Sequence, residues 1–328
     1  MWQVLLLGNG AAQASRKYTG MAPEADIVVV KGGESSFTTT NIINGMSYLQ
    51  NLSATLGKPV VLNMSLGGLT GAHDGTRADE IALDNFTASG PGRVVVVSAG
   101  NSNGSLLHTT ATLNSAASQT VNFTVPSGTS GTDVFQYRVY ANDNSNVSAL
   151  VTTPSAENVT AAAGESKAVS VAAGNFTVNI VNDIDPANGD RYVNLYITRT
   201  AGNPVGTWSL QITNNAAVPI TLHGWLNYRS TSFSTTSVST GDNNYLVGSP
   251  GNASSAITVA SFVGKIGWYS QGANGGFIYS GGATQIKFLL SAPLAPAAME
   301  RKNRISLLLV RRWFRYCRPT LHLLLRKM

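Results

Sequence analysis

The chain of 328 residues is 43% hydrophobic and only 12% charged, a composition typical of a folded globular protein rather than a disordered one. No segment reaches the roughly 18 consecutive apolar residues that a membrane helix requires, so we expect no membrane span. The net charge of +6 comes from residues 300–328, which hold nine Lys and Arg against one acid and leave 13 bases and 15 acids in residues 1–299. That nearly neutral body lacks the footprint of a nucleic-acid-binding protein. The single cysteine, Cys317, leaves residues 1–299 without a disulfide or a cysteine-based metal site.

Three short apolar runs in the first hundred residues predict buried strands at residues 27–30, 60–62 and 94–97. None of them alternates polar with apolar residues. Such runs are typical of parallel strands that are covered on both faces.

Two helices are expected to connect these strands. Apolar residues recur at helical spacing from Ile42 to Leu56, after a Thr/Asn cluster and before Gly57 and Pro59, which end the helix. A second amphipathic helix lies in "DGTRADEIALDNFTASGPG" and ends near residues 90–92. The order strand, helix, strand, helix, strand predicts an open parallel sheet, in which ligands bind at the carboxyl ends of the strands.

After about residue 105 the composition shifts to alternating, Thr- and Asn-rich runs such as "QTVNFTV", "DVFQYRVY" and "RYVNLYITR". These runs, separated by turn signals, predict an antiparallel β-sandwich of jelly-roll type. Another apolar strand is expected at residues 256–263, so the sandwich reads as an insertion into an α/β domain. The expected division is core at 1–104, sandwich at 105–232, core continued at 233–288 and a non-native tail at 289–328.

Four segments in this order closely resemble the subtilisin-like serine proteases (subtilases): "KYTGMAPEADIVVVKGG", "VVLNMSLGG", "RVVVVSAGNSNG" and "GSPGNASSAITVAS". The insertion resembles that of bacterial subtilases with a jelly-roll module, such as the Csp-type proteases. The resemblance covers about residues 8–285. It implies a subtilase-type α/β sheet and a serine endopeptidase acting on peptide or protein substrates, secreted or at the bacterial cell surface. It implies no cofactor, and no metal ligands can be assigned.

The resemblance also assigns roles to residues. In subtilases the Asn of the "AGN" motif donates its side-chain N–H to the oxyanion, and Asn101 matches that position. Loss of one such donor costs on the order of 10²–10³ in turnover, as subtilisin itself exemplifies. Residues 98–100 would wall the pocket for the side chain before the scissile bond, and residues 65–68 would pair with substrate as an added strand. The residues expected to contact substrate are Ser65, Leu66, Gly67, Gly68, Ser98, Ala99 and Gly100.

Other interpretations of these residues remain open from the sequence. Asn101 taken alone is an ordinary turn residue after a strand, and residues 65–68 taken alone are an ordinary exit from a strand. His73 and Asp74 adjoin each other in "GAHDGT", but neighbours on a loop rarely face one another. We interpret that segment as the loop before a helix, with Asp74 as a candidate cap.

The remaining histidines and tryptophans of the β-rich region are interpreted as structural. His108 and His223 lie at its edge or inside it. Trp208 and Trp225 alternate with apolar residues, which favours core packing over carbohydrate binding.

The catalytic triad of the family, Asp, His and Ser in that chain order, has no match in residues 1–328. Residues 1–7 stand where the His motif should end, and the Ser motif "GTSMAxP" does not follow residue 285. We therefore expect that the protein is related to endopeptidases but that a polypeptide with this sequence is catalytically inactive. The alternative is a pseudoprotease that binds peptides or partners without cutting them, whereas a standalone adhesion module would not explain the α/β motifs.

A pair of frameshifts would explain both ends. In a neighbouring frame, the codons of residues 1–7 permit "HVAGIAAG", and those of residues 290–310 permit "FSSPGPSRDGTKKPDIAAPG". Both strings are subtilase segments in the expected places, so we predict that Cys317 and the basic tail are out-of-frame products. Sequencing the gene tests this. Bases that spell neither segment in a neighbouring frame would leave the pseudoprotease interpretation.

Overall fold

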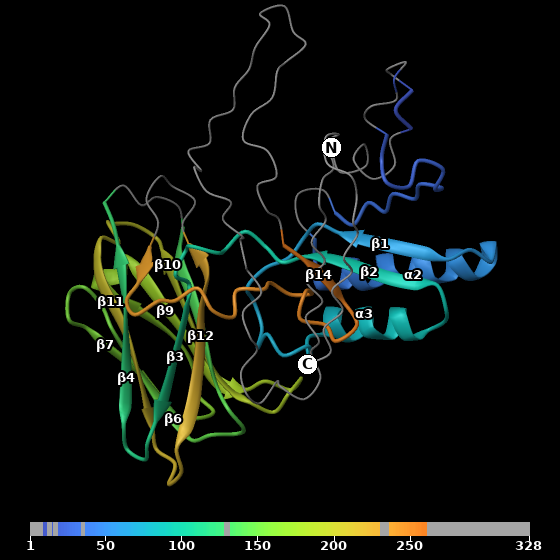
Figure 1. The fold of residues 1–328 in the computed structure, drawn as a ribbon. Coiled ribbons are helices and arrows are strands. Elements are labelled where there is room, and N and C mark those ends of the chain that lie inside the picture. The colour runs from blue at the N-terminus through green and yellow to red at the C-terminus, as the bar shows by residue number, and fades with distance from the viewer. Residues whose placement is uncertain are drawn as a thin grey trace, which may run out of the picture.

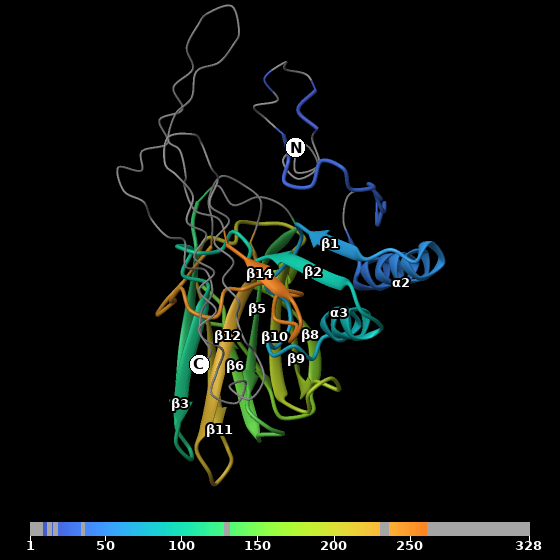
Figure 2. The same ribbon diagram turned by 45° about the vertical axis from the view of Figure 1, so that its right-hand side comes forward.

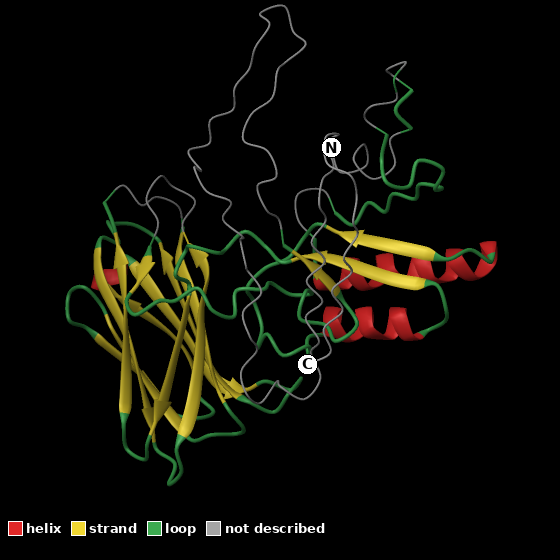
Figure 3. Ribbon diagram, viewed as in Figure 1, coloured by secondary structure: helices red, strands yellow, loops and turns green. Residues whose placement is uncertain are grey.

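The computed structural model describes residues 9–11, 15, 19–33, 37–127, 132–229 and 236–260. These residues form two parts: a small parallel sheet with two helices, and a pair of antiparallel sheets (Figures 1 and 3). The tail expected at 289–328, and the part of the strand expected beyond residue 260, lie outside the described residues.

The parallel sheet has the strand order β1-β2-β14, with β1 at Val60–Met64, β2 at Arg93–Ser98 and β14 at Ile257–Val259. Helix α2 (Thr39–Leu56) precedes β1, and helix α3 (Ala78–Ala88) connects β1 to β2. The two predicted helices and the strands predicted at 60–62 and 94–97 are thus confirmed.

Helix α2 begins within the Thr/Asn cluster and ends before Gly57, close to the boundaries that the sequence predicts. The Thr38 side chain accepts a hydrogen bond from the Asn41 amide at 3.1 Å, and Gly57 closes the helix with a φ of 61°. The apolar faces of both helices pack against one face of the parallel sheet. The buried residues of this small core are Met46, Leu49, Met64, Leu83, Phe86, Val95, Val97 and Ala253.

The strand predicted at residues 27–30 is wrong, because these residues form no strand in the structure. Ile27 is 56% exposed and Val29 is 69% exposed, and residues 27–30 pair with none of the described strands. A buried parallel strand needs a hydrogen-bonding neighbour as well as apolar side chains. β1, the outer strand of the sheet, is itself uncovered on one face, where Val61 is 68% exposed.

The antiparallel part begins ten residues after β2. Figure 2 shows its two sheets from a second direction. Its six-stranded sheet has the order β3-β12-β5-β10-β9-β8, and its five-stranded sheet has the order β13-β4-β11-β6-β7. The elements are β3 His108–Leu113, β4 Ser118–Val125, β5 Asp133–Ala141, β6 Val147–Thr152, β7 Asn158–Ala161, β8 Ser166–Val171, the short helix η1 Ala172–Gly174, β9 Phe176–Ile184, β10 Arg191–Arg199, β11 Gly206–Asn214, β12 Ile220–Arg229 and β13 Ser237–Val238.

Aromatic side chains join the two antiparallel sheets. Phe123 of β4 stacks on Phe135 of β5, with ring centroids 4.7 Å apart. The ring of Tyr137, also in β5, meets the Phe123 ring edge-on. Trp208 and Trp225 are each only 1% exposed, which confirms the prediction that both tryptophans pack in a core.

The chain returns to the parallel sheet after the antiparallel part. β14 pairs in parallel with β2, so the whole antiparallel part lies between two strands that are neighbours in one sheet. The segment that makes this return runs across the junction between the two parts, and it contributes to the site described below.

Candidate functional site

The site is formed where β1 and β2 end. The two strands are parallel, and Met64 lies opposite Val97 in their register. Residues 65–68 and 98–101 therefore leave the sheet at the same end, and the Ser98 hydroxyl donates to the Leu66 carbonyl at 3.3 Å. We refer to residues 65–68 and 98–101 together as the strand-end site. The parallel register thus places the eight residues that the sequence singled out at the same end of the sheet, with a direct contact between Ser98 and Leu66.

Most of the strand-end site is open to solvent. Ser65, Gly67, Gly68, Gly100 and Asn101 are exposed. Leu66 and Ser98 are half-buried, and Ala99 is 2% exposed. Gly100 has a φ of 96°, a backbone conformation that a residue with a Cβ rarely adopts, so this turn before Asn101 depends on glycine.

A third segment, which contains Gly248 and Ser249 and leads from the antiparallel part back to the parallel sheet, contacts both residues 65–68 and residues 98–101. Ser249 forms an antiparallel bridge with Gly68, with backbone hydrogen bonds of 2.9 and 3.2 Å. The Gly248 amide donates to the Ala99 carbonyl at 3.3 Å. The approach is close, since a Cβ added to Gly67 would lie 3.0 Å from the Ser249 carbonyl oxygen. Glycine at position 67 makes room for this bridge.

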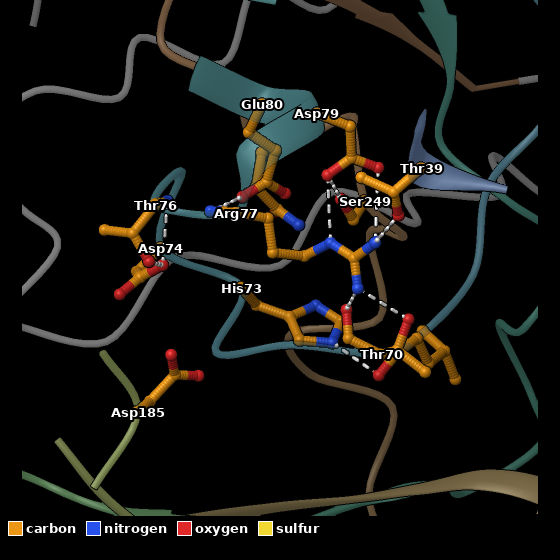
Figure 4. Close-up of polar contacts among 12 residues, drawn as sticks. Thr39, Thr70, His73, Asp74, Thr76, Arg77, Asp79, Glu80, Asp185 and Ser249 are labelled. Atoms are coloured by element: carbon orange, nitrogen blue, oxygen red, sulfur yellow. Dashed lines mark hydrogen bonds and ion pairs between the residues drawn. The ribbon is translucent and has the colours of Figure 1, made fainter. Parts of the chain in front are cut away.

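Arg77 fixes the loop that follows residues 65–68 (Figure 4). Its guanidinium donates to the Thr70 carbonyl at 2.9 Å and to the Thr70 hydroxyl at 2.8 Å. Two further bonds, of 3.0 and 3.3 Å, reach the carboxylate of Asp79, which is 2% exposed. The guanidinium also donates to the Thr39 hydroxyl at 3.3 Å, which connects this loop to the first turn of α2. This fork geometry suits arginine and not lysine.

A buried carboxyl group lies next to this ion pair. Glu80 is 0% exposed, and its carboxylate accepts the Arg77 backbone N–H at 3.1 Å. Burial raises the pKa of Glu80 to about 7. The first turn of α3 is closed by this contact rather than by Asp74. Asp74 accepts from the Thr76 amide and hydroxyl at 3.0 and 2.5 Å, in a turn that ends before the helix, so its prediction as a cap is wrong.

His73 lies beneath the Gly68–Ser249 bridge and does not face Asp74. It is 4% exposed, and its two ring nitrogens lie 2.8 Å from the Val247 carbonyl oxygen and 3.0 Å from the Leu69 carbonyl oxygen. The ring stacks on Trp225 with centroids 4.3 Å apart and planes 8° from parallel. Burial lowers the pKa of His73 to about 4.

The other two histidines of the described residues lie around the same tryptophan. His108 bonds Asp242 at 2.8 Å through Nδ1 and His223 at 3.0 Å through Nε2. Burial lowers the pKa of both imidazoles, that of His223 to about 4. Their rings lie 5.1 and 6.1 Å from Trp225. This arrangement supports a structural role at the junction between the two parts.

Acidic side chains also meet at this junction. Asn188 donates to Asp74 at 2.8 Å and to Asp190 at 3.1 Å, which joins a loop of the antiparallel part to the loop before α3. Burial raises the pKa of Asp190 to about 6. Within the described ranges no three His, Cys, Asp or Glu side chains are grouped so that they could hold a metal ion.

The sequence did not identify Ser249, Arg77 or His73 as parts of the site. Ser249 is 181 positions from its partner Gly68, and the Gly/Pro-rich turn around it gives no indication of that pairing. The contacts of Arg77 and His73 likewise arise only once the loops are folded together.

Comparisons with known proteins agree with this architecture. A model of the subtilase family matches residues 6–178. The solved structure of the CspB protease of Clostridium perfringens is similar, with a TM-score of 0.66 at 18% identity over 78% of this chain. The match covers 54% of that structure, so the chain spans about half its length. In the described part of the chain, no helix is long and apolar enough to span a membrane. The chain belongs to the subtilase family.

Proposed function

We propose that the strand-end site binds the backbone of a peptide or protein substrate of a subtilisin-like serine endopeptidase. The observation that carries this proposal is the contact between the Ser98 hydroxyl and the Leu66 carbonyl, which places two family motifs side by side at one sheet end. Parallel sheets bind ligands at this end. Within residues 65–68, Ser65 and Gly67 are exposed and alternate with Leu66 and Gly68, whose carbonyl groups already bond Ser98 and Ser249. The backbone at Ser65 and Gly67 suits a peptide added as a strand, because main-chain hydrogen bonds need no particular side chain.

Asn101 is proposed to stand at the position of the residue that, in a catalytically complete subtilase, donates to the oxyanion formed during acyl transfer. Its exposed side chain follows the left-handed turn at Gly100. A neutral amide N–H that is held in place favours the developing negative charge of the tetrahedral intermediate over the uncharged substrate carbonyl. The antiparallel part is proposed to be a jelly-roll-like insertion, and the protein a secreted or cell-surface bacterial protease.

Residues 1–328 contain no match to the family's Ser motif, so we propose that this polypeptide binds peptides without cutting them. With the oxyanion donor but neither nucleophile nor base, at most a residual 10³- to 10⁴-fold effect over water is expected, on the order seen when triad residues are removed. We therefore expect the 328-residue polypeptide to show binding and no turnover, whether it derives from an endopeptidase gene or is a pseudoprotease.

The test combines binding with active-site labelling. Fluorescein-labelled casein peptides are titrated with the 328-residue polypeptide, and binding is followed by fluorescence anisotropy. Gly68→Leu is the blocking variant, because Gly68 is exposed and a Cβ at position 68 meets nothing within 4 Å, so the added side chain starts into open space. We expect at least about tenfold weaker binding from this variant, the equivalent of about 1.4 kcal/mol.

The matched control is Thr112→Leu, which adds a leucine at an exposed position of β3 in the antiparallel part. It should bind like the unmodified chain. Equal binding by the Gly68 variant would refute the site. Stoichiometric labelling of a serine by a fluorophosphonate probe would refute the absence of catalysis.

A further inference from the structure

We propose that His73 is a positioning residue for the strand-end site: its buried ring fills the space between the two segments of the Gly68–Ser249 bridge and donates one hydrogen bond to a carbonyl group beside the bridge. Only the expected effect of His73 on peptide binding rests on the proposed function. The bridge itself, and the contacts of His73, are features of the structure.

The two carbonyl groups that His73 contacts belong to the two segments that the Gly68–Ser249 bridge joins. Leu69 directly follows Gly68, and Val247 lies two residues before Ser249. The ring therefore spans from the loop after β1 to the segment that returns from the antiparallel part. With only 4% of His73 exposed, water cannot readily replace the ring in these contacts.

The returning segment, residues 245–249, is held at every second carbonyl. Trp225 Nε1 donates to the Tyr245 carbonyl at 2.8 Å, and a ring nitrogen of His73 lies 2.8 Å from the Val247 carbonyl. The Gly68 amide donates to the Ser249 carbonyl at 3.2 Å. The His73 ring thus lies at the middle of these three carbonyl groups. The Gly248 amide, which donates to the Ala99 carbonyl at 3.3 Å, and the Asn252 side chain, which donates to the Val247 carbonyl at 3.1 Å, hold the same segment beside it.

Trp225 sets the plane of the His73 ring. The two rings are stacked 4.3 Å apart and 8° from parallel, so the imidazole cannot rotate away from the two carbonyl groups without losing this contact. The pKa of about 4 keeps the ring neutral near pH 7. A neutral imidazole has one N–H and donates to one of the two carbonyl groups.

The backbone at His73 supports a role for its side chain. Its φ of 59° lies in the left-handed region, which histidine adopts more often than most residues with a Cβ. This conformation turns the side chain into the buried space between the loop after β1, the returning segment and Trp225.

Amide hydrogen exchange on the 328-residue polypeptide, without peptide, tests the positioning role directly. In His73→Ala the amides of Gly68, Gly248 and Ser249 should exchange about fivefold faster, the equivalent of roughly 1 kcal/mol of local stability. Amides of β5 and β10, in the antiparallel part, should keep their rates. Added imidazole, which fits the space left on Trp225, should restore slow exchange.

His223→Ala is the control for the loss of another histidine from the same cluster. Its ring meets that of Tyr245, with centroids 5.0 Å apart, but its hydrogen bond goes to His108 and not to a carbonyl group of the bridge. It should leave the exchange of Gly68 unchanged. His73→Asn keeps the left-handed backbone and serves if the alanine variant does not fold. Equal exchange of the Gly68 amide in the unmodified chain, His73→Asn and His73→Ala would overturn the proposal.

Peptide binding is then measured on the same variants. We expect His73→Ala to weaken casein-peptide binding at least about fivefold, an effect of roughly 1 kcal/mol, with His223→Ala unchanged. If the unmodified chain binds no peptide, the proposed function fails, yet the exchange rates still decide whether His73 holds the bridge. Faster exchange with unaltered binding would refute the link to the site.

Discussion

Trp225→Ala should lower the free energy of unfolding by about 3–5 kcal/mol, the cost typical of removing a fully buried tryptophan. The side chain is 1% exposed and stacks against His73. It also donates a hydrogen bond of 2.8 Å to the Tyr245 carbonyl. Its loss leaves a cavity and removes this hydrogen bond at the junction between the two parts. Urea unfolding followed by circular dichroism measures the effect.

Trp208→Ala separates a loss of core packing from a loss of the junction. Trp208 is also 1% exposed, but its ring contacts, with Phe135 and Phe176, lie within the antiparallel part. Both variants should lose similar stability, and only Trp225→Ala should speed hydrogen exchange at Gly68. A loss below about 1 kcal/mol for Trp225→Ala would contradict the packing argument.

The sequence predicted the elements whose signals are local. Helix α2 has an apolar face and residues at both ends that stop it, and the runs before residues 65 and 98 are strands. The common position of residues 65–68 and 98–101 follows from chain topology, because parallel neighbours end together. None of these predictions needs information about distant contacts.

Residues 27–30 show where apolar character fails as a signal. Their sequence is as strand-like as that of β2, yet they are exposed and pair with none of the described strands. Whether an apolar run becomes a strand depends on a neighbouring strand that offers hydrogen bonds, and the run itself carries no information about that neighbour.

His73 shows the same limit within the site. Its sequence neighbour Asp74 suggested a pair, but the structure turns the two side chains apart, toward Val247 and Asn188 respectively. Both partners are more than a hundred residues away in the chain. Contacts of this kind depend on how the loops pack, which local patterns of residues do not determine.

Glu80→Gln should raise the free energy of unfolding at pH 8 by about 3 kcal/mol and leave it nearly unchanged at pH 4.5. Burial raises the pKa of Glu80 from 4.5 to about 7 in the folded chain. The folded state therefore holds a proton that the unfolded state releases, so this stability is present below pH 4.5 and is lost as the pH rises through 7. Glutamine is neutral at every pH and keeps an oxygen for the Arg77 amide.

Asp84→Asn, also in α3, is the control with the opposite sign. Asp84 accepts hydrogen bonds from the amides and hydroxyls of Ser254 and Ser255, between 2.6 and 3.2 Å long. Although partial burial acts in the other direction, these bonds lower the pKa of Asp84. Its contribution is therefore present above pH 3.8 and lost as the pH falls, so Asp84→Asn should destabilise the chain at pH 8 and progressively less toward pH 3.

Urea unfolding of the unmodified chain and both variants, measured from pH 4 to pH 8, distinguishes these effects from changes at other titrating groups. His73 and His223, with lowered pKa values, and Asp190, with a raised one, titrate alike in all three chains and cancel in the differences. A Glu80→Gln difference that does not grow with pH would show that the carboxyl group is ionised in the folded chain. The ion pair of Arg77 and Asp79 would then have a second anion beside it at neutral pH, and the loop after residues 65–68 would be held by a network of three charges rather than two.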